Sequence, residues 1–419
     1  MRAHDLQRMI RRRAVVFGGV QLLATSALVS RLYYLQFVRG EEFSTLAEDN
    51  RVKLQLMMPP RGVIADRNGV TLAGNHVNYR LMLEGDSRKT ARQCLQILTP
   101  LMKLSDREVR QLTDQIRVRK VGIPIQVREH LSWEEVARVQ FHAPQLPAVF
   151  IDEGQWRNYP FSDHFSHLLG YVGKVAPNEV KDDEPLLKLP EMKIGKNGVE
   201  ALYEKRLRGV AGAKRIEVNA MGSPVRELKR EDPKPGDVLP LTIDSRLQEY
   251  CVERLGEESG AIVVMDVHSG EVLALVSMPA FDPNEFSKGI TSAYWKELNA
   301  NKKTPLHNKA IAGQYPPGST FKMVTGLAGL KSGKFTADSH VYCNGTFYLG
   351  NHPFTCWKVE GHGSMNMAQA IEQSCDVFFY TVARDIGIEA LAEMSEEFGL
   401  GKRSGLDLRG EQPGIVPSP

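Results

Sequence analysis

The sequence lacks a strong excess of charge of either sign. Its 419 residues contain 53 Lys and Arg against 50 Asp and Glu, which gives a formal net charge of +3 at pH 7. So small an excess does not provide the basic surface that a nucleic-acid partner requires. The content of 42% hydrophobic and 25% charged residues is ordinary for a globular protein of this length. We therefore expect a multidomain globular protein with no nucleic-acid partner.

Long uncharged runs are also scarce, and one lies near the N-terminus. Residues 14–30 carry no charge, and residues 32–35 continue the apolar run past Arg31. This pattern predicts a transmembrane anchor at residues 14–35, with residues 1–13 as a cytoplasmic tail and the remainder beyond the membrane. A cleaved signal peptide is the alternative, because Ala24 and Ser26 are small residues suited to a cleavage site. Arginines precede the run and favour the cytoplasmic side for the N-terminus: Arg2, Arg8, Arg11, Arg12 and Arg13.

The segment after the anchor predicts a stalk and then a β-hairpin. Residues 36–60 are interpreted as the stalk. Short apolar runs within residues 63–72 flank Asp-Arg-Asn-Gly at residues 66–69, which is a strong hairpin signal.

Helices are expected to dominate residues 88–139. Two of them begin with capping boxes, in which Ser105 and Ser132 are each followed three residues later by Glu. Farther on, Arg157 is interpreted as part of a structural salt bridge.

The best candidate for a domain boundary is Pro-Lys-Pro-Gly-Asp at residues 233–237, because it is rich in turn-forming residues. We therefore assign residues 36–235 to one domain and residues 236–419 to another. Two largely apolar runs at residues 260–266 and 271–277 predict an antiparallel hairpin in a buried sheet of the second domain.

The stretch that organises the second domain is a serine at the start of an apolar helix. Prolines and a glycine at residues 316–318 prevent a helix before Ser319, and the apolar residues that follow predict a helix buried almost all round. Ser319 and Lys322 fall on one face of that helix. A serine needs a base within hydrogen-bond reach to be a good nucleophile, and a lysine amine in an apolar setting can be that base. Ser319 and Lys322 are therefore candidate catalytic residues.

A second candidate site lies at the break between two helical stretches. Ser374 and Asp376 fall at this break, between residues 367–373 and 377–386. A serine here can relay a proton from the lysine, and the aspartate can hold the lysine or a substrate amide by hydrogen bonding. The alternative interpretation is that Ser374 is only a helix cap.

These motifs together resemble a known family. Tyr-Pro-Pro-Gly-Ser-Thr-Phe-Lys at residues 315–322 resembles the active-site signature of the penicillin-binding proteins, serine enzymes that cross-link bacterial cell-wall peptides and are acylated by β-lactams. Ser374-x-Asp376 resembles the family's second active-site motif. The resemblance covers essentially the whole chain and is closest to the elongation-specific class B enzymes. Segments that resemble the class B pedestal signatures lie at residues 60–73, 157–160, 167–173, 198–203 and 207–212.

The resemblance implies a fold in three parts: a transmembrane helix, a non-catalytic α+β pedestal of the dimerisation type, and an α/β serine transpeptidase domain of the β-lactamase-like fold. It implies that Ser319 attacks the penultimate D-alanine carbonyl of a peptidoglycan stem peptide and passes the acyl group to an amine, or to water in a carboxypeptidase reaction. It also implies a single-pass protein of the bacterial inner membrane with a periplasmic body. The implied partners are stem peptides, β-lactams, a glycan polymerase of the shape and division (SEDS) family and a rod-shape scaffold protein.

The family's third motif, Lys-Thr-Gly or Lys-Ser-Gly, is missing from the 419 residues. In family members this strand supplies part of the oxyanion hole, and each such donor is worth about 10²–10³ in rate. We therefore expect the transpeptidase domain to be incomplete, as a fragment or an inactive truncation. Two rival functions remain open: a catalytically inactive scaffold for the polymerase, and a β-lactam sensor or β-lactamase.

The cysteines predict a metal site. An odd total of five cannot pair completely within one copy. Cys343, Cys356, His362 and Cys375 form a Cys₃His set of the kind that binds one structural zinc ion. Some elongation-specific penicillin-binding proteins carry zinc ligands in the same segment, with aspartates in place of the first two cysteines. The alternative is a disulfide between Cys343 and Cys356 with His362 on the surface. The remaining cysteines, Cys94 and Cys251, are expected to be buried small residues.

Overall fold

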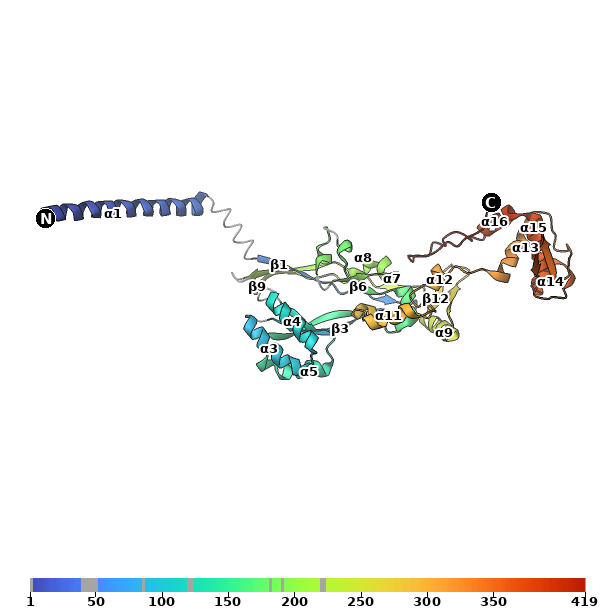
Figure 1. The fold of residues 1–419 in the computed structure, drawn as a ribbon, viewed down its shortest axis with the longest axis horizontal. Helices are drawn as coiled ribbons and strands as arrows, with labels where there is room; N and C mark the ends of the chain where they lie inside the picture. Colours follow the sequence, from blue (N-terminus) through green and yellow to red (C-terminus); the bar gives the residue numbers. More distant parts are fainter. Residues whose placement is uncertain are drawn as a thin grey trace.

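Helix α1 (Ala3–Tyr33) continues into one π-helical turn at Tyr34–Val38 and extends away from the rest of the protein (Figure 1). The stretch Val15–Val38 has 24 residues, a mean hydropathy of 1.5 and no buried part. About 20 apolar residues are enough to cross the hydrocarbon core of a bilayer. The helix predicted at residues 14–35 is therefore present, and it is long and apolar enough to be a single membrane anchor.

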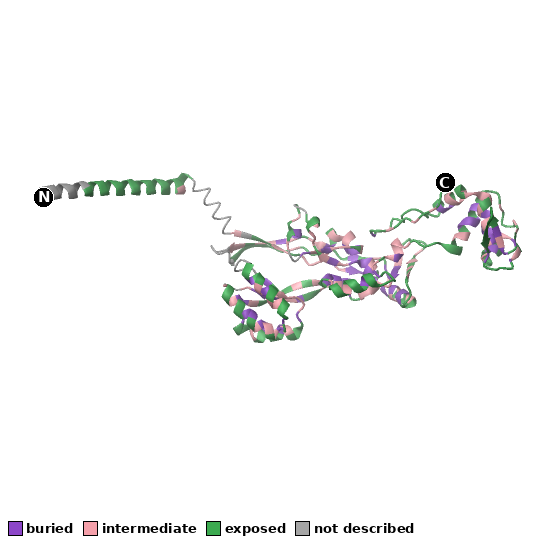
Figure 2. Ribbon diagram, in the orientation of Figure 1, coloured by how far each residue is buried: buried purple, intermediate pink, exposed green. Residues whose placement is uncertain are grey.

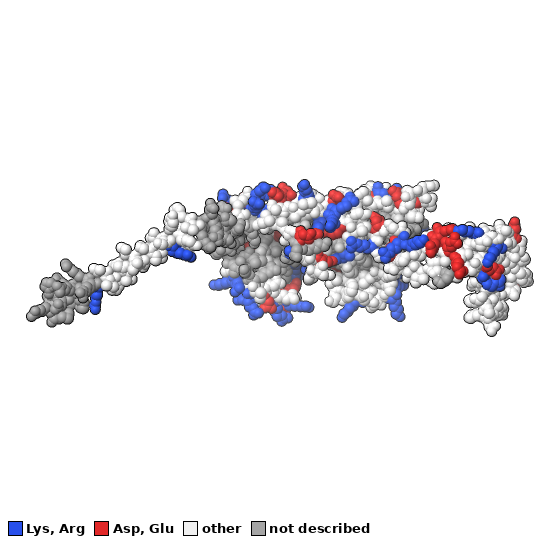
Figure 3. All heavy atoms as spheres, turned by 90° about the horizontal axis from the view of Figure 1, so that it is seen from above, with Lys and Arg blue, Asp and Glu red and all other residues white. Residues whose placement is uncertain are grey.

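The computed structural model places the body of the protein in an elongated arrangement beyond α1 (Figure 1). Acidic and basic side chains are mixed along the face seen in Figure 3. The residues that the structure describes are 3–38, 52–84, 87–118, 124–180, 183–189, 192–218 and 224–418.

A three-stranded antiparallel sheet begins the body, and it corrects one prediction. Strand β1 (Val52–Met57) pairs with β8 (Gly212–Val218), which pairs with β9 (Pro224–Glu231). Residues 52–57 are therefore an edge strand, whereas the sequence predicted a stalk over residues 36–60. The paired residues are 155 to 165 positions apart along the chain, so no local pattern could reveal the pairing.

A five-stranded sheet forms the centre of the pedestal. Its order is β10 (Leu239–Pro240), β2 (Ile64–Ala65), β3 (Thr71–Leu83) and β4 (Ile125–Arg128), with β5 (Val149–Asn158) also paired to β3. The predicted hairpin at residues 63–72 is confirmed, because β2 and β3 are antiparallel. Strand β10 lies on the far side of the predicted boundary, yet it pairs in parallel with β2.

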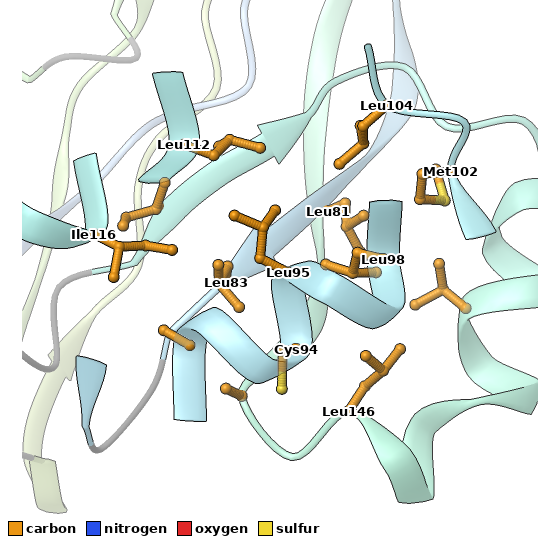
Figure 4. Close-up of a cluster of buried hydrophobic side chains, with 14 of the residues drawn as sticks. Leu81, Leu83, Cys94, Leu95, Leu98, Met102, Leu104, Leu112, Ile116 and Leu146 are labelled. Carbon is orange, nitrogen blue, oxygen red and sulfur yellow. The ribbon is translucent and has the colours of Figure 1, made fainter. Parts of the chain in front are cut away.

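A helical lobe packs against β3. It consists of α3 (Arg88–Leu101), α4 (Asp106–Val118) and α5 (Trp133–Phe141). Figure 4 shows leucines of β3 and α3 meeting residues of α4 in its core. Both predicted capping boxes are present, because Ser105 and Ser132 each exchange hydrogen bonds with the glutamate three residues later.

A second core joins the pedestal to the next domain. Buried residues from both parts pack together in the purple central region of Figure 2. The pedestal provides Leu72 and Phe165 among others, and the second domain provides Leu275 and Leu408. Two domains with a continuous core match the predicted architecture of pedestal and transpeptidase domain.

The second domain opens with α9 (Ser245–Leu255), β11 (Gly260–Met265) and β12 (Val272–Met278). The predicted antiparallel hairpin is confirmed. The sheet was predicted to be buried, and this holds for the centre of β12 but not for β11, where Val263 and Met265 are exposed. Helix α9 covers one face of this two-stranded sheet, and the outward residues of β11 face away from it.

The apolar helix α13 (Phe321–Lys331) follows one 3₁₀ turn at Gly318–Thr320 that contains Ser319. The prediction that this helix is buried almost all round is wrong. Val324 and Ala328 are buried, but Met323 and Leu327 are exposed. The helix packs on α15 (Asp376–Ile386) and α16 (Ile388–Glu397), and within the described residues that contact covers one side.

The remaining elements are short. In the pedestal they are α6 (Ser166–Leu169), β6 (Val172–Lys174), β7 (Lys193–Gly195), α7 (Gly198–Leu202) and α8 (Glu204–Arg208), with 3₁₀ turns at Ala143–Gln145, Ser162–Phe165, Pro177–Glu179 and Pro185–Lys188. In the second domain they are α10 (Pro283–Lys288), α11 (Ser292–Ala300), α12 (Lys309–Ala312), β13 (Val341–Cys343), β14 (Thr346–Leu349), β15 (His352–Thr355), β16 (Gly363–Met365) and α14 (Met367–Glu372).

Candidate active site and adjoining cysteine cluster

Ser319 lies in the tight turn that leads into α13. Gly318, directly before it, has a φ of +57°, a left-handed conformation that glycine adopts without steric cost. Lys322 follows in the first turn of α13. The local sequence therefore places a hydroxyl and an amine at the entrance of one helix, as predicted.

Lys322 is joined to the second motif by three hydrogen bonds. Its Nζ lies 2.8 Å from the backbone oxygen of Ser374, 3.0 Å from Ser374 Oγ and 2.6 Å from Asp376 Oδ1. An ammonium group has three N–H donors, so each donor has one acceptor here. The Lys322 side chain is only 13% exposed. The structure thus brings Lys322 to Ser374 and Asp376, which lie more than 50 residues farther along the sequence.

Ser374 connects this lysine to Ser319. Ser374 Oγ donates a hydrogen bond to Ser319 Oγ over 2.9 Å. Among the described residues, the hydrogen bonds that link Ser319 to Lys322 therefore run through Ser374. The three side chains form a continuous path along which a proton can move from the nucleophile to the amine.

The backbone holds Ser374 in an unusual conformation. Its φ is +51°, which costs a non-glycine residue about 1–2 kcal/mol. Hydrogen bonds from the N–H of Ser374 to the oxygen of Ile371, and from Cys375 to Ala370, keep the turn closed between α14 and α15. This turn directs the Ser374 hydroxyl at Ser319, which a simple helix cap would not require.

Asp376 is the first residue of α15 and uses both carboxylate oxygens. Oδ1 accepts from Lys322, and Oδ2 accepts from the backbone N–H of Trp357 over 3.1 Å. Sequence reasoning did not identify Trp357. Its position directly after Cys356 was the only available signal, because its contact with Asp376 is made across the fold.

The four predicted metal ligands converge beside this site. Cys343 ends β13, Cys356 follows β15, His362 precedes β16 and Cys375 precedes α15, and their ligand atoms all lie within 4.8 Å of one another. All three sulfurs are buried as free thiols, and His362 Nδ1 faces two of them. In this arrangement His362 belongs to the cluster, whereas the disulfide alternative placed it on the surface.

Two distances in the cluster match the edges of a tetrahedral metal site. His362 Nδ1 lies 3.7 Å from the sulfur of Cys343 and 3.6 Å from that of Cys356. A tetrahedron with Zn–S of about 2.3 Å and Zn–N of about 2.0–2.1 Å has an S···N edge of about 3.6 Å. These two S···N separations suit one tetrahedral ion, and the four ligand atoms, all within 4.8 Å of one another, are close enough to bind it together.

The electrostatic setting differs between two of the thiols. Burial alone would raise the pKa of Cys356, but backbone N–H groups of Lys358, Asp376 and Val377 point at its sulfur and lower that pKa. Burial, together with the neighbouring Cys343 thiol, raises the pKa of Cys375 to about 12. Two of the N–H groups at Cys356 belong to the first turn of α15, where the helix dipole favours negative charge.

Known proteins match this chain over both domains. The penicillin-binding protein dimerisation domain matches residues 56–241, and the penicillin binding protein transpeptidase domain matches residues 260–419. Peptidoglycan D,D-transpeptidase MrdA of Acinetobacter baumannii is 35% identical over 415 residues, which cover 99% of this chain and 62% of that protein. The chain thus spans less than two thirds of the length of this curated relative.

Solved structures agree with these matches. The complex between penicillin-binding protein (PBP2) and MreC from Helicobacter pylori superposes with a TM-score of 0.76 at 31% identity, over 88% of this chain and 69% of that one. A structure of a peptidoglycan synthase complex that coordinates polymerisation and cross-linking has a TM-score of 0.66 at 29% identity, over 97% of this chain and 70% of that one.

Proposed function

This chain belongs to the penicillin-binding proteins. We propose that it acts as a peptidoglycan D,D-transpeptidase of the elongation-specific type, with Ser319 as the nucleophile. The observation that carries the proposal is the path of hydrogen bonds from Ser319 through Ser374 to Lys322. MrdA of A. baumannii, by its name, catalyses the same reaction.

The proposed reaction begins with the transfer of a proton along this path. When Lys322 is a neutral amine, its two N–H groups can remain on Ser374 O and Asp376, and its lone pair faces Ser374 Oγ. For this step the Ser374 hydroxyl rotates to donate to the neutral amine and accepts from the Ser319 hydroxyl, so that Ser374 passes its proton to the amine and takes the proton of Ser319. The Ser319 oxygen then bonds to the penultimate D-alanine carbonyl carbon of a stem peptide.

The second half of the reaction returns the proton. As the C–N bond to the terminal D-alanine breaks, Ser374 donates a proton to the leaving amine and is reprotonated by Lys322. An amine on a neighbouring strand then attacks the acyl carbon, the ester bond to Ser319 breaks, and the Ser319 oxygen regains a proton as the amine loses one, which completes the cross-link. Water in place of that amine would give D-Ala-D-Ala carboxypeptidase activity. A β-lactam would be attacked by the same serine and would remain bound as an acyl group.

Labelling with fluorescent penicillin tests this proposal. The sample is the membrane-embedded protein expressed from its complete gene. We expect the label on Ser319 and its loss in Ser319→Ala. Ser332→Ala is a matched control, because Ser332 caps the other end of α13 and its hydroxyl bonds only to the local backbone of Gly329 and Lys334. Label that persists in Ser319→Ala would refute the assignment, and a protein that never labels would favour the scaffold function.

We also propose that Cys343, Cys356, His362 and Cys375 hold one structural zinc ion. The support is the convergence of the four side chains, together with the match of two S···N distances to a tetrahedral site. Zinc would supply a closed cross-link between the β13–β16 segment and the start of α15, not a reactive centre. Three thiolate ligands favour zinc over harder ions such as magnesium.

For location and partners, we propose that α1 crosses the inner membrane with its N-terminus in the cytoplasm and the body in the periplasm. The support is the apolar stretch Val15–Val38 and the arginines before it. The H. pylori relative was solved with MreC, and another relative in a peptidoglycan synthase complex. We therefore propose a rod-shape scaffold protein and a SEDS-type glycan polymerase as partners, which the pedestal would bind.

A further inference from the structure

Trp357 lies between the cysteine cluster and the catalytic groups and contacts both. It follows Cys356 directly in the chain, and its ring meets the ring of His362 edge-on with 5.2 Å between centroids. On its other side its backbone N–H donates to Asp376 Oδ2. The mechanism proposed above assigns no role to this residue.

The hydrogen bond from Trp357 gives the second carboxylate oxygen of Asp376 a donor. Asp376 is 22% exposed and stands at the first position of a helix, where an aspartate side chain has several rotamers available. Lys322 holds one oxygen and the Trp357 N–H holds the other. With both oxygens occupied, the carboxylate has one orientation, and the Lys322 amine is kept next to Ser374 Oγ. Without the second bond, Asp376 could turn toward solvent and take Lys322 with it.

The indole of Trp357 is exposed but anchored. Although 61% of the residue is accessible, Nε1 donates to the backbone oxygen of Gln373 over 3.0 Å. Gln373 directly precedes Ser374. The indole therefore connects the turn that carries Ser374 to the ring of His362, and these two anchors fix the direction of the Trp357 backbone N–H.

We infer that Trp357 is a positioning residue for the proposed transpeptidase: its anchored indole aims its backbone N–H at Asp376 and so couples the order of the metal-binding segment to the Lys322–Asp376 pair. This inference rests on the proposed function. Trp357 should therefore affect the rate constant of acylation and not the binding of substrate or metal.

The test measures penicillin acylation of the membrane-embedded protein as its gene encodes it, with Trp357→Ala and Trp357→Phe. Trp357→Ala removes both anchors and should lower the acylation rate constant about 10-fold or more, because small displacements of reacting groups have effects of this size. The dissociation constant for non-covalent penicillin should change less than about 2-fold. Trp357→Phe keeps the ring contact with His362 but not the bond to Gln373, so it should be intermediate. Zinc content should stay at the wild-type level in both variants.

Trp295→Ala is the matched control, because Trp295 is also exposed, at 46%, and lies on α11 against Phe286. It should acylate like the wild type. In Trp357→Ala, hydrogen exchange at the start of α15 should be faster than in wild type, a readout that needs no penicillin.

Two results would overturn the inference alone: an unchanged acylation rate constant in both Trp357 variants of a protein that labels normally, or a loss of zinc in proportion to the loss of rate. A wild-type protein that does not label at Ser319 would instead overturn the proposed function, and the inference with it.

Discussion

Asp66, in the turn of the pedestal hairpin, accepts a hydrogen bond from Ser245 Oγ over 2.7 Å, and Ser245 is the first residue of α9 in the second domain. The same carboxylate oxygen accepts from the Ser245 backbone N–H, while the other accepts from Asn68 and Val70. Asp66 is only 1% exposed. One buried carboxylate therefore ties a tight turn of the pedestal to the start of a helix in the transpeptidase domain.

The Asp66 bond predicts a pH-dependent loss of stability. Burial alone would raise the pKa of Asp66, but the hydrogen bonds from Ser245, Val70 and Asn68 outweigh it and lower the pKa from 3.8 to about 2. Because the pKa of Asp66 is lower in the folded protein than in the unfolded chain, its ionised form stabilises the fold by about 2 kcal/mol at pH values above the unfolded pKa. This contribution is lost as the pH falls from about 4 to about 2.

Asp66→Asn tests this pH dependence. The variant should melt at a lower temperature than wild type at pH 7, and the difference should shrink between about pH 4 and pH 3 because asparagine does not titrate. Asp114→Asn is the control, since the Asp114 side chain is 70% exposed. An equal difference in melting temperature at pH 7 and pH 3 would contradict the prediction.

Ser374→Gly should separate stability from activity. Glycine adopts the φ of +51° without strain, so the variant should unfold at the same temperature as wild type or higher. Loss of the hydroxyl breaks the path from Ser319 to Lys322, so acylation by penicillin should fall by about 10²–10⁴. Ser374→Ala is the comparison, because it loses the hydroxyl but keeps the strain. A Ser374→Gly protein that acylates at the wild-type rate would exclude the relay.

Removal of metal should loosen the segment around the cysteine cluster. Atomic analysis of protein purified without chelator should find about one zinc per chain, and a strong chelator should lower the melting temperature, since a structural zinc site stabilises the folded state. Cys356→Ser should bind less zinc and melt at a lower temperature.

Cys251→Ser is the control for the metal prediction, because Cys251 is buried in the core between α9 and β12, away from the cluster. It should retain its zinc. A metal-free native protein with Cys343 and Cys356 joined by a disulfide would refute the site.

Glu200→Gln should destabilise the pedestal. Glu200 is fully buried and pairs with Arg157, 2% exposed, over 2.6 Å, and also with Arg61. The structural salt bridge predicted for Arg157 is thus confirmed. Removing the anion leaves a buried guanidinium without its counter-charge, which costs about 3–5 kcal/mol. Urea unfolding should show this loss, while Glu271→Gln, in an exposed pair with Arg67, should cost less than about 1 kcal/mol. Equal effects of the two substitutions would contradict the prediction.

Local patterns in the sequence were sufficient for the features that a few neighbouring residues determine. These features depend on contacts within about one or two turns of chain. They are the apolar helix near the N-terminus, the turn at residues 66–69, the capping boxes at Ser105 and Ser132, and the Ser319–Lys322 spacing. Helix periodicity, glycine conformation and capping chemistry act over that range, so one sequence is enough to predict them.

Only the tertiary structure decided which residues far apart in the sequence contact one another. Four features join residues far apart along the chain or depend on which faces are covered. They are the pairing of β1 with β8, the exposed side of α13, the place of Ser374 between Ser319 and Lys322, and the bond from Trp357 to Asp376. The sequence could name Ser374 and the four cysteine-cluster residues as candidates. Their convergence depends on how α13, α14, α15 and the β13–β16 segment pack, because packing, and not local propensity, sets distances between side chains that the chain separates by many residues.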